Sequence, residues 1–328
     1  MPTSVWRTID IDRGDHGVRV DRVLLRHLRD ERAISRNRIQ KWIDAGDVLV
    51  NGTPPSRAAW RVQAGDEVRV KVEHLQPRTR PAAQAMDLDV LYEDDDLLAI
   101  NKAAGLVVHP SYKNAGGTLM NGVLERAKAW PVGSRPGLLG RLDKDTSGVV
   151  VVAKRPAVHA ALQRAMDARR IDKDYAVIVW GRPSPVRGTI DLALDRDPWD
   201  RRRITVTDRG GQPSVTKYER LAATPGTPGT FSFVRCRLIT GRTHQIRVHL
   251  AARGWPIVGD AAYGRKRKGG EPTPQDDIAF AFPRQALHAW RLSLRHPTTG
   301  VPMEIVAPLP ADMQHLAAAL GLPGPARA

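Results

Sequence analysis

The sequence contains a single cysteine, Cys236, and no hydrophobic run near the length of a membrane-spanning helix. One cysteine excludes an internal disulfide and is typical of a reducing compartment. A helix needs about 20 apolar residues to cross a bilayer. The first residues also lack the basic and then apolar pattern of a secretory signal peptide. We therefore expect a cytoplasmic protein without a membrane partner.

Several common catalytic motifs are also absent. The sequence has no Gly-x-Ser-x-Gly nucleophile turn and no phosphate-binding loop of the Walker or dinucleotide type. His244 and His249 are five residues apart, whereas paired metal ligands on a helix are four apart, and no third ligand has a clear spacing. Asp143 and Asp145 are two apart in a turn, which argues against a glycosidase pair. We expect no metal site.

Acidic residues are few relative to basic ones. The 328-residue chain has 51 Lys and Arg against 35 Asp and Glu, for a formal net charge of +16 and a pI near 10.6. Such an excess favours a polyanionic partner, most commonly nucleic acid. A membrane surface is the alternative, but no basic helix with a broad apolar face is present. The length favours two domains, and a hydrophobic content of 41% is sufficient for a substantial core.

Residues 1–74 are predicted to form a small N-terminal domain. Apolar residues recur at helical spacing over residues 19–28, and Ser35 is placed to cap a second helix. Short strand patterns follow at residues 48–50 and 68–72. The sequence therefore predicts two helices followed by strands in this domain.

The second predicted helix carries three basic residues, Arg36, Arg38 and Lys41. A solvated helix face without a binding role is the ordinary explanation, and a phosphate-contacting face is the alternative. Residues 76–84 include two prolines and almost no apolar side chain. Residues 75–87 are therefore predicted to be a linker stiffened by proline.

A second domain is expected at residues 88–310, followed by a C-terminal helix and tail at 311–328. Strand patterns occur in clusters rather than in strict alternation with helices, which favours an α+β fold over a doubly wound sheet. The expected strands are residues 90–92, 97–100, 149–153, 175–179, 214–220, 231–238 and 303–306. The expected helices are residues 118–129, 157–168, 243–252 and 311–320. Residues 265–268 are expected to form a mobile basic loop.

The segment most suggestive of chemistry is Gly-Arg-Leu-Asp-Lys-Asp-Thr-Ser-Gly at residues 140–148, directly before an apolar strand pattern. A carboxylate here would lie at the edge of the core, where it is partly desolvated and rigid. A surface turn whose Asp and Thr side chains bond to their own backbone explains the same residues. The spacing alone leaves both interpretations open.

Three further clusters contain basic or reactive side chains. They are Lys102 with His109, the Lys-Asp-Tyr segment at residues 173–175, and residues 240–250. In the last cluster, Ile246 is four residues before a leucine, so both are expected to face the core.

Taken together, these segments resemble the RluA family of ribosomal RNA pseudouridine synthases, and most closely its RluD-like subgroup. Residues 18–72 resemble the ribosomal-protein-S4-like RNA-binding domain that precedes the catalytic domain in that subgroup. In the catalytic part, the family's motifs occur in the family's order: Asn101-Lys102, Val108-His109-Pro110, residues 141–148, 173–175 and 240–250, Gly259-Asp260, Tyr263-Gly264 and residues 284–289. The resemblance implies a mixed, largely antiparallel sheet flanked by helices.

The resemblance implies that the protein isomerises specific uridines of large-subunit ribosomal RNA to pseudouridine, without a metal or cofactor. Asp143 is then the catalytic carboxylate, and a bidentate pair with Arg247 keeps it ionised. Arg141 fills the gap left by a flipped-out uridine, and Tyr175 stacks on the uracil above Ile246. The other implied substrate-binding residues are Lys102, His109, Arg242, His244 and Gln245. The implied RNA-binding residues of the first domain are Arg36, Arg38 and Lys41.

The resemblance departs from the family at one position. The family usually has histidine directly before Arg-Leu-Asp, whereas this chain has Gly140, as a related group of ribosomal pseudouridine synthases commonly does. A catalytically inactive RNA-binding factor is the alternative function, and it would be expected to lack Asp143 or Arg247, which are both present. A monomer is the family expectation. Attack on the ribose, attack on the ring and proton abstraction from the ribose all remain open.

Overall fold

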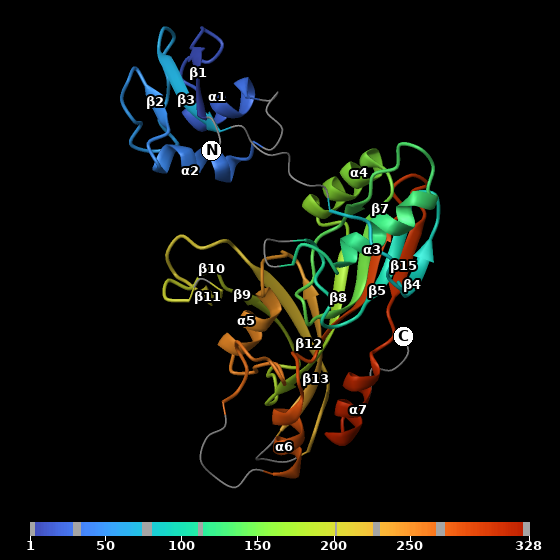
Figure 1. The fold of residues 1–328 in the computed structure, drawn as a ribbon. Coiled ribbons are helices and arrows are strands. Elements are labelled where there is room, and N and C mark those ends of the chain that lie inside the picture. The colour runs from blue at the N-terminus through green and yellow to red at the C-terminus, as the bar shows by residue number, and fades with distance from the viewer. Residues whose placement is uncertain are drawn as a thin grey trace. The chain divides into compact units, whose positions relative to one another are not determined.

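The computed structural model describes residues 4–28, 34–73, 81–110, 114–200, 202–225, 230–266 and 273–323. The chain divides into two compact units, Met1–Arg80 and Pro81–Ala328 (Figure 1). Residues 75–80 of the expected linker, residues 267–268 of the expected basic loop, and residues 324–328 of the tail lie outside the described residues. Within the described part, no helix combines the length and hydropathy needed to span a bilayer.

The first unit is a three-stranded antiparallel sheet in the order β1-β3-β2 with two helices. Its elements are β1 (Ser4–Asp10), α1 (Val20–His27), α2 (Arg36–Asp44), β2 (Val48–Val50) and β3 (Glu67–Glu73). The Ser35 hydroxyl accepts a hydrogen bond from the backbone N–H of Arg38 at 3.3 Å, which confirms the predicted helix cap. Buried aliphatic side chains from both helices and all three strands form one core.

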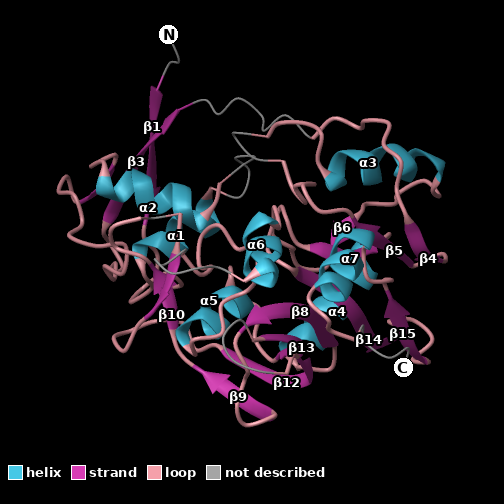
Figure 2. Ribbon diagram, turned by 90° about the horizontal axis from the view of Figure 1, so that it is seen from below, coloured by secondary structure: helices cyan, strands magenta, loops and turns pink. Residues whose placement is uncertain are grey.

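The second unit contains a ten-stranded sheet in the order β4-β5-β7-β14-β8-β13-β12-β9, with β15 beside β14 and β6 beside β7. These strands are β4 (Val90–Glu93), β5 (Leu97–Lys102), β6 (Gly137–Leu138), β7 (Ser147–Ala153), β8 (Asp172–Trp180), β9 (Arg187–Asp191), β12 (Val215–Ala223), β13 (Phe231–Leu238), β14 (Leu287–Arg295) and β15 (Pro302–Val306). Figure 2 shows them crossing the view from β4 to β9. Among these described strands, only β7 and β14 pair in parallel, so the predicted mixed, largely antiparallel α+β fold is confirmed.

The helices of this unit cover the sheet, and a small hairpin stands apart from it. The helices are α3 (Leu119–Arg126) with a 3-10 turn (Ala127–Ala129), α4 (Pro156–Asp167), α5 (Gln245–Ala252), α6 (Pro274–Ala281) and α7 (Ala311–Ala319). The separate hairpin is β10 (Leu194–Arg196) and β11 (Ile204–Val206).

Strand β7 is buried along its whole length because helices cover both of its faces. Val149 and Val151 pack in one core cluster with Leu162 of α4, while Val150 and Val152 pack in another with α3. A third cluster joins β8 and β13 to α5 and α7. The residues directly before β7 therefore lead into a rigid, fully packed strand.

The sequence did not predict several of these elements. Strands β1, β6, β9, β10, β11 and β14 and helix α6 were not expected. Part of the expected linker is bound to the second unit, because the N–H of Gln84 donates to the Asn121 carbonyl at 3.0 Å and the Asn121 amide donates to the Ala82 carbonyl at 2.6 Å. Helix α7, expected as part of a separate tail, packs into the core of this unit through Met313 and Leu316.

Candidate active site

Asp143 lies in the turn that leads into β7. The backbone N–H of Thr146 donates to the Asp143 carbonyl at 3.1 Å and closes the turn. Just beyond it, β7 approaches β14 so closely that a Cβ on Gly148 would lie 2.2 Å from the Ala289 carbonyl oxygen. Gly148 also has φ +112°, so glycine is required there for two reasons. The turn is thus anchored at its C-terminal end by close backbone packing.

Two buried cations hold the carbonyl groups of this turn. The Lys102 ammonium donates to the Lys144 carbonyl at 2.9 Å, and also to the carbonyls of Ala103 and Leu106. Arg284 donates to the Asp145 carbonyl at 3.2 Å. Burial lowers the pKa of Lys102 to about 8. The backbone path around Asp143 is therefore fixed from outside the turn.

Arg247, on α5, makes a single hydrogen bond to the Asp143 carboxylate rather than a bidentate pair. Its Nη1 donates to Asp143 Oδ2 at 2.9 Å, whereas its Nε and Nη2 donate to the two oxygens of Asp260 at 2.7 and 2.9 Å. The expected bidentate pair with Asp143 is therefore wrong. The fork is occupied by Asp260, because that carboxylate is fully buried behind the arginine.

The charges of this triad are fixed by their neighbours. Burial alone would raise the pKa of Asp260, but hydrogen bonds from Arg247 and from the N–H groups of Ala262 and Tyr263 hold that pKa below its ordinary value. Burial opposes the charge of Arg247, yet the two carboxylates raise its pKa further above the ordinary value. Asp143, with 25% of its side chain exposed, is thus presented beside a permanent cation.

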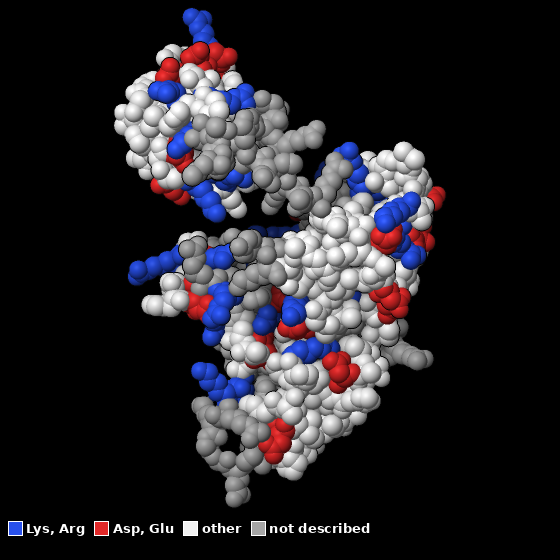
Figure 3. Space-filling model, viewed as in Figure 1, with Lys and Arg blue, Asp and Glu red and all other residues white. Residues whose placement is uncertain are grey.

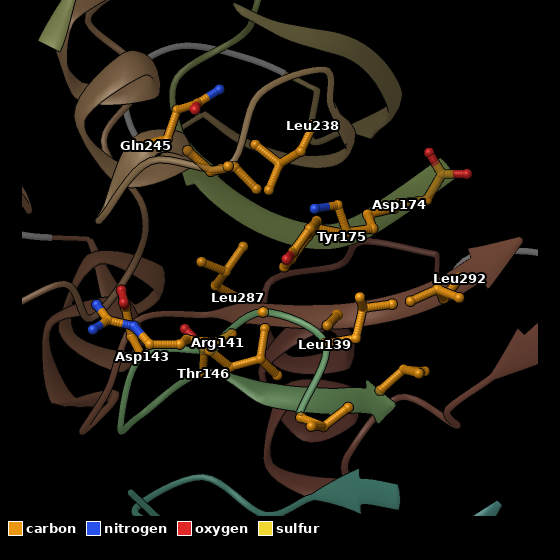
Figure 4. Close-up of a pocket in the computed structure, with 18 of the residues that line it drawn as sticks. Leu139, Arg141, Asp143, Thr146, Asp174, Tyr175, Leu238, Gln245, Leu287 and Leu292 are labelled. Atoms are coloured by element: carbon orange, nitrogen blue, oxygen red, sulfur yellow. The ribbon is translucent and has the colours of Figure 1, made fainter. Parts of the chain in front are cut away.

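A cavity of about 140 Å³ opens beside Asp143. Figure 4 shows Tyr175 and Leu287 facing the same space, with Asp143 and Arg141 together at one end. Tyr175, on β8, is 7% exposed, and burial and then the Asp143 charge raise its pKa, so the phenol stays neutral. Ile246 also lines the wall. The cavity thus brings a partly exposed carboxylate, Asp143, and its fixed cation, Arg247, beside a flat aromatic surface.

The turn before α5 contributes three more of the expected residues to the cavity wall. Arg242 is exposed at this wall. His244 has a left-handed backbone conformation, with φ +55°. Its Nδ1 shares a hydrogen bond with the Tyr263 hydroxyl at 2.9 Å, and its Nε2 lies 3.9 Å from Asp143 Oδ2. Burial lowers the pKa of His244. Gln245 is 2% exposed.

The expected role of Gln245 as a substrate contact does not fit its bonding. Its Oε1 accepts from the Thr240 hydroxyl and the Arg242 N–H, and its Nε2 donates to the Val215 carbonyl and the Thr216 hydroxyl. The amide is fully used in holding the turn before α5. Gln245 therefore positions the residues around it.

Lys102 and His109 lie outside the cavity wall, so the direct substrate contacts expected from them are not supported. Lys102 is 1% exposed and its three donors are all bound to backbone carbonyls. His109 is exposed, and burial of part of its ring and the nearby charge of Arg141 lower its pKa.

The basic residues expected to bind RNA in the first unit all lie on α2. Arg36 and Lys41 are exposed. The Arg38 guanidinium lies over the Trp42 ring, 5.7 Å from its centroid, and so is only half-buried. This face is available to a ligand.

The sequence motifs contained residues whose roles sequence reasoning missed. The sequence identifies Asp260 and Arg284 only as parts of motifs. The glycines near Asp260 were the one sequence feature that could have indicated close backbone packing there. A Cβ on Gly259 would lie 2.1 Å from the Arg284 carbonyl oxygen, and one on Gly264 would lie 2.2 Å from the Asp260 carbonyl oxygen. Such contacts mark a tightly folded segment behind Arg247. No group of His, Cys, Asp and Glu among the described residues is arranged to hold a metal ion.

Comparison with known proteins identifies the family. The RNA pseudouridylate synthase family model matches residues 96–252, and the S4 domain model matches residues 18–68. A protein from Xanthomonas campestris named ribosomal large subunit pseudouridine synthase D is 42% identical over 292 residues, covering 87% of this chain and 85% of the relative. This chain belongs to the RNA pseudouridine synthases.

Other relatives support the assignment across the chain. A Xylella fastidiosa protein of the same name is 42% identical and covers 96% of this pseudouridine synthase and 92% of the relative. A Bacillus subtilis protein named as an uncharacterized RNA pseudouridine synthase is 40% identical, over 86% and 88% of the two chains. The solved structure of human RNA pseudouridylate synthase domain containing 4 matches with a TM-score of 0.58 at 25% identity, over 72% of this chain and 94% of that one. These matches confirm the enzyme class, the S4 domain and the synthase fold that the sequence predicts.

Proposed function

We propose that this RNA pseudouridine synthase converts specific uridines of large-subunit ribosomal RNA to pseudouridine, with Asp143 as the catalytic carboxylate. The names of the relatives support the ribosomal substrate. The contact between Asp143 and Arg247 beside Tyr175 carries the assignment of the catalytic group. No other carboxylate among the described residues combines a cavity position with partial exposure and contact with Arg247.

The reaction breaks the bond from uracil N1 to ribose C1′, turns the base and joins C5 to C1′. The proton on C5 is lost and N1 gains one, so no redox partner or added group is needed. Asp143 has to be ionised whether it acts as a nucleophile or as a base. Arg247 supplies a cation that does not titrate in the physiological range, and Asp260 keeps that cation aimed at Asp143.

The target uridine has to leave its stack, which costs a few kcal/mol. Tyr175 supplies an aromatic face on which the uracil stacks, worth about 1–3 kcal/mol, with Ile246 as an apolar support. Arg141 is exposed at the cavity rim and fills the vacated position in the RNA. The stacking gain thus offsets the flipping cost.

Affinity for the rest of the RNA comes from charge. Figure 3 shows Lys and Arg side chains across the face of the second unit that carries α5 and the β10–β11 hairpin, with acidic groups between them. The hairpin presents Trp199, 92% exposed, beside the exposed Arg202. Arg36, Arg38 and Lys41 on α2 provide phosphate contacts in the S4 domain. With a net charge of +16, binding to ribosomal RNA fragments by a monomer should weaken steeply with salt, and a flat salt profile would contradict this proposal.

The decisive experiment uses ribosomal RNA labelled with tritium at C5 of uridine. The wild-type protein should release tritium and leave pseudouridine in the RNA. Asp143→Asn should abolish release while leaving RNA binding nearly unchanged. Release that survives this substitution would remove Asp143 from the proposed role, and free uracil in a chromatogram would indicate a glycosidase instead.

A further inference from the structure

Lys173 lies in the cavity wall two residues before Tyr175 on β8. Side chains two apart on a strand share a face, so both point toward the space beside Asp143. The Lys173 ammonium lies 3.6 Å from the position that a Cβ on Gly241 would occupy, which places it against the turn before α5. Its neighbour Asp174 pairs with Arg237 and Arg291.

No hydrogen bond or ion pair holds the Lys173 ammonium within the described part of the chain, although Lys102 and Lys154 are both paired. Burial lowers the pKa of Lys173, because nothing compensates its charge. Burying an unpaired cation costs free energy, so a folded protein does not gain stability from it. A charged group kept in the cavity at this cost is available to a ligand.

Three other polar groups of the cavity wall are already bonded. Arg247 is bound to two carboxylates, His244 to Tyr263, and the Gln245 amide to four partners. Asp143 is the only carboxylate named in the proposed chemistry, and it is already paired. Arg141 and Arg242 are exposed at the wall, and Arg291 is paired with Asp174. Lys173 is therefore the half-buried cavity cation that no described group holds.

We propose that the Lys173 ammonium binds a negatively charged oxygen of the target nucleotide. This inference rests on the proposed function and extends it to a further substrate-binding residue. Two oxygens have this chemistry. One is a phosphate oxygen beside the flipped uridine, and the other is a uracil carbonyl, which takes up charge while the electron pair of the broken N1–C1′ bond stays on the ring. Lys173 keeps its proton throughout.

The test compares Lys173→Met and Lys173→Arg with wild type and with Lys217→Met, an exposed lysine on β12 outside the cavity wall. Pseudouridine formation under single-turnover conditions and RNA affinity as a function of salt are measured on one ribosomal RNA fragment. Thermal unfolding is measured for each variant. Lys173→Met should melt no lower than wild type, because it removes an unpaired, half-buried charge.

Each source of the oxygen gives a different result. A phosphate contact predicts that Lys173→Met lowers the salt slope of log affinity by about 1. A carbonyl contact predicts an unchanged slope and a single-turnover rate lower by about 10²-fold or more. In both cases Lys173→Arg should recover most of the loss, and Lys217→Met should match wild type in rate.

Two outcomes would overturn the inference. One is a Lys173→Met protein equal to wild type in both rate and slope. The other is parallel loss of activity and melting temperature in both Lys173 variants, which would indicate a structural role. A wild-type protein that forms no pseudouridine in ribosomal RNA would instead contradict the proposed function.

Discussion

Replacing Asp260 by Asn should lower the rate of pseudouridine formation, although Asp260 itself does not contact the substrate. Asp260 accepts two hydrogen bonds from Arg247 at 2.7 and 2.9 Å, and its side chain is fully buried. An asparagine has the same shape but offers one acceptor, and its amide N–H₂ would face the second N–H of Arg247. We expect Arg247 to turn away from that amide and to lose its contact with Asp143.

The magnitude follows from the burial of the pair. Removing one partner of a buried, hydrogen-bonded ion pair costs about 3–5 kcal/mol of folding free energy, because the other charge is left uncompensated. Asparagine keeps one acceptor for Arg247, so the lower end of the range is expected for Asp260→Asn. Misplacement of Arg247 by about 1 Å is sufficient to lower the rate about 10²-fold.

The assay is single-turnover pseudouridine formation on a ribosomal RNA fragment, at a temperature where denaturant unfolding shows the variant to be folded. RNA affinity is measured in parallel and should be unchanged, because Asp260 is not at the surface. Asp96→Asn is the matched control. Asp96 is also buried and paired with an arginine, Arg155, but it lies outside the cavity wall. It should lose stability and keep its single-turnover rate.

The reasoning fails if folded Asp260→Asn protein forms pseudouridine at the wild-type rate. It fails equally if Asp96→Asn slows the reaction as much as Asp260→Asn does, because the effect would then belong to general destabilisation rather than to the aim of Arg247.

Two further predictions follow from the same structure. Tyr175→Phe should keep most activity because stacking survives, whereas Tyr175→Ala should lower the single-turnover rate severely; equal rates for the two variants would exclude the stacking role. His288 is fully buried between the Ser147 hydroxyl and the Ala307 carbonyl, and burial lowers its pKa from 6.5 to about 4. Because the unfolded chain binds a proton there near pH 6.5 and the folded protein does not, stability should fall as pH drops, by about 2 kcal/mol between pH 7 and pH 5. Urea unfolding should show this loss in wild type and a smaller one in His288→Asn, and identical pH dependence in the two proteins would refute it.

The sequence predicts best those helices and strands whose apolar residues follow a regular local pattern. The cap at Ser35 and the continuous apolar run of β7 were identified because a side-chain hydroxyl before a helix and an unbroken buried strand both leave clear patterns. Strand β14 was missed, although its motif was recognised. Its polar side chains are satisfied by partners far along the chain, such as Ser147 for His288 and Asp174 for Arg291, and a polar residue with a distant partner looks like a surface residue in the sequence.

The candidate site shows the same limit. Resemblance brought Asp143, Arg247 and Tyr175 together, and the structure places all three at one cavity. The allocation of the Arg247 fork to Asp260 was not predictable, because two carboxylates compete for one guanidinium and only their burial decides between them. The resemblance implies a substrate contact for Lys102, because the sequence around a lysine does not reveal the three backbone carbonyls that bind its ammonium in the fold.

The C-terminal helix α7 is tied to the turn that carries Asp143. Arg284 donates to the Asp145 carbonyl in the turn before β7 and, through Nε and Nη2, to both oxygens of Asp312 at 2.7 and 2.9 Å. Asp312 lies in the first turn of α7, where its charge also favours the helix. One buried guanidinium therefore ties the last helix to the segment that carries Asp143. A residue near the end of the sequence thus contributes to the geometry of the site without approaching the substrate.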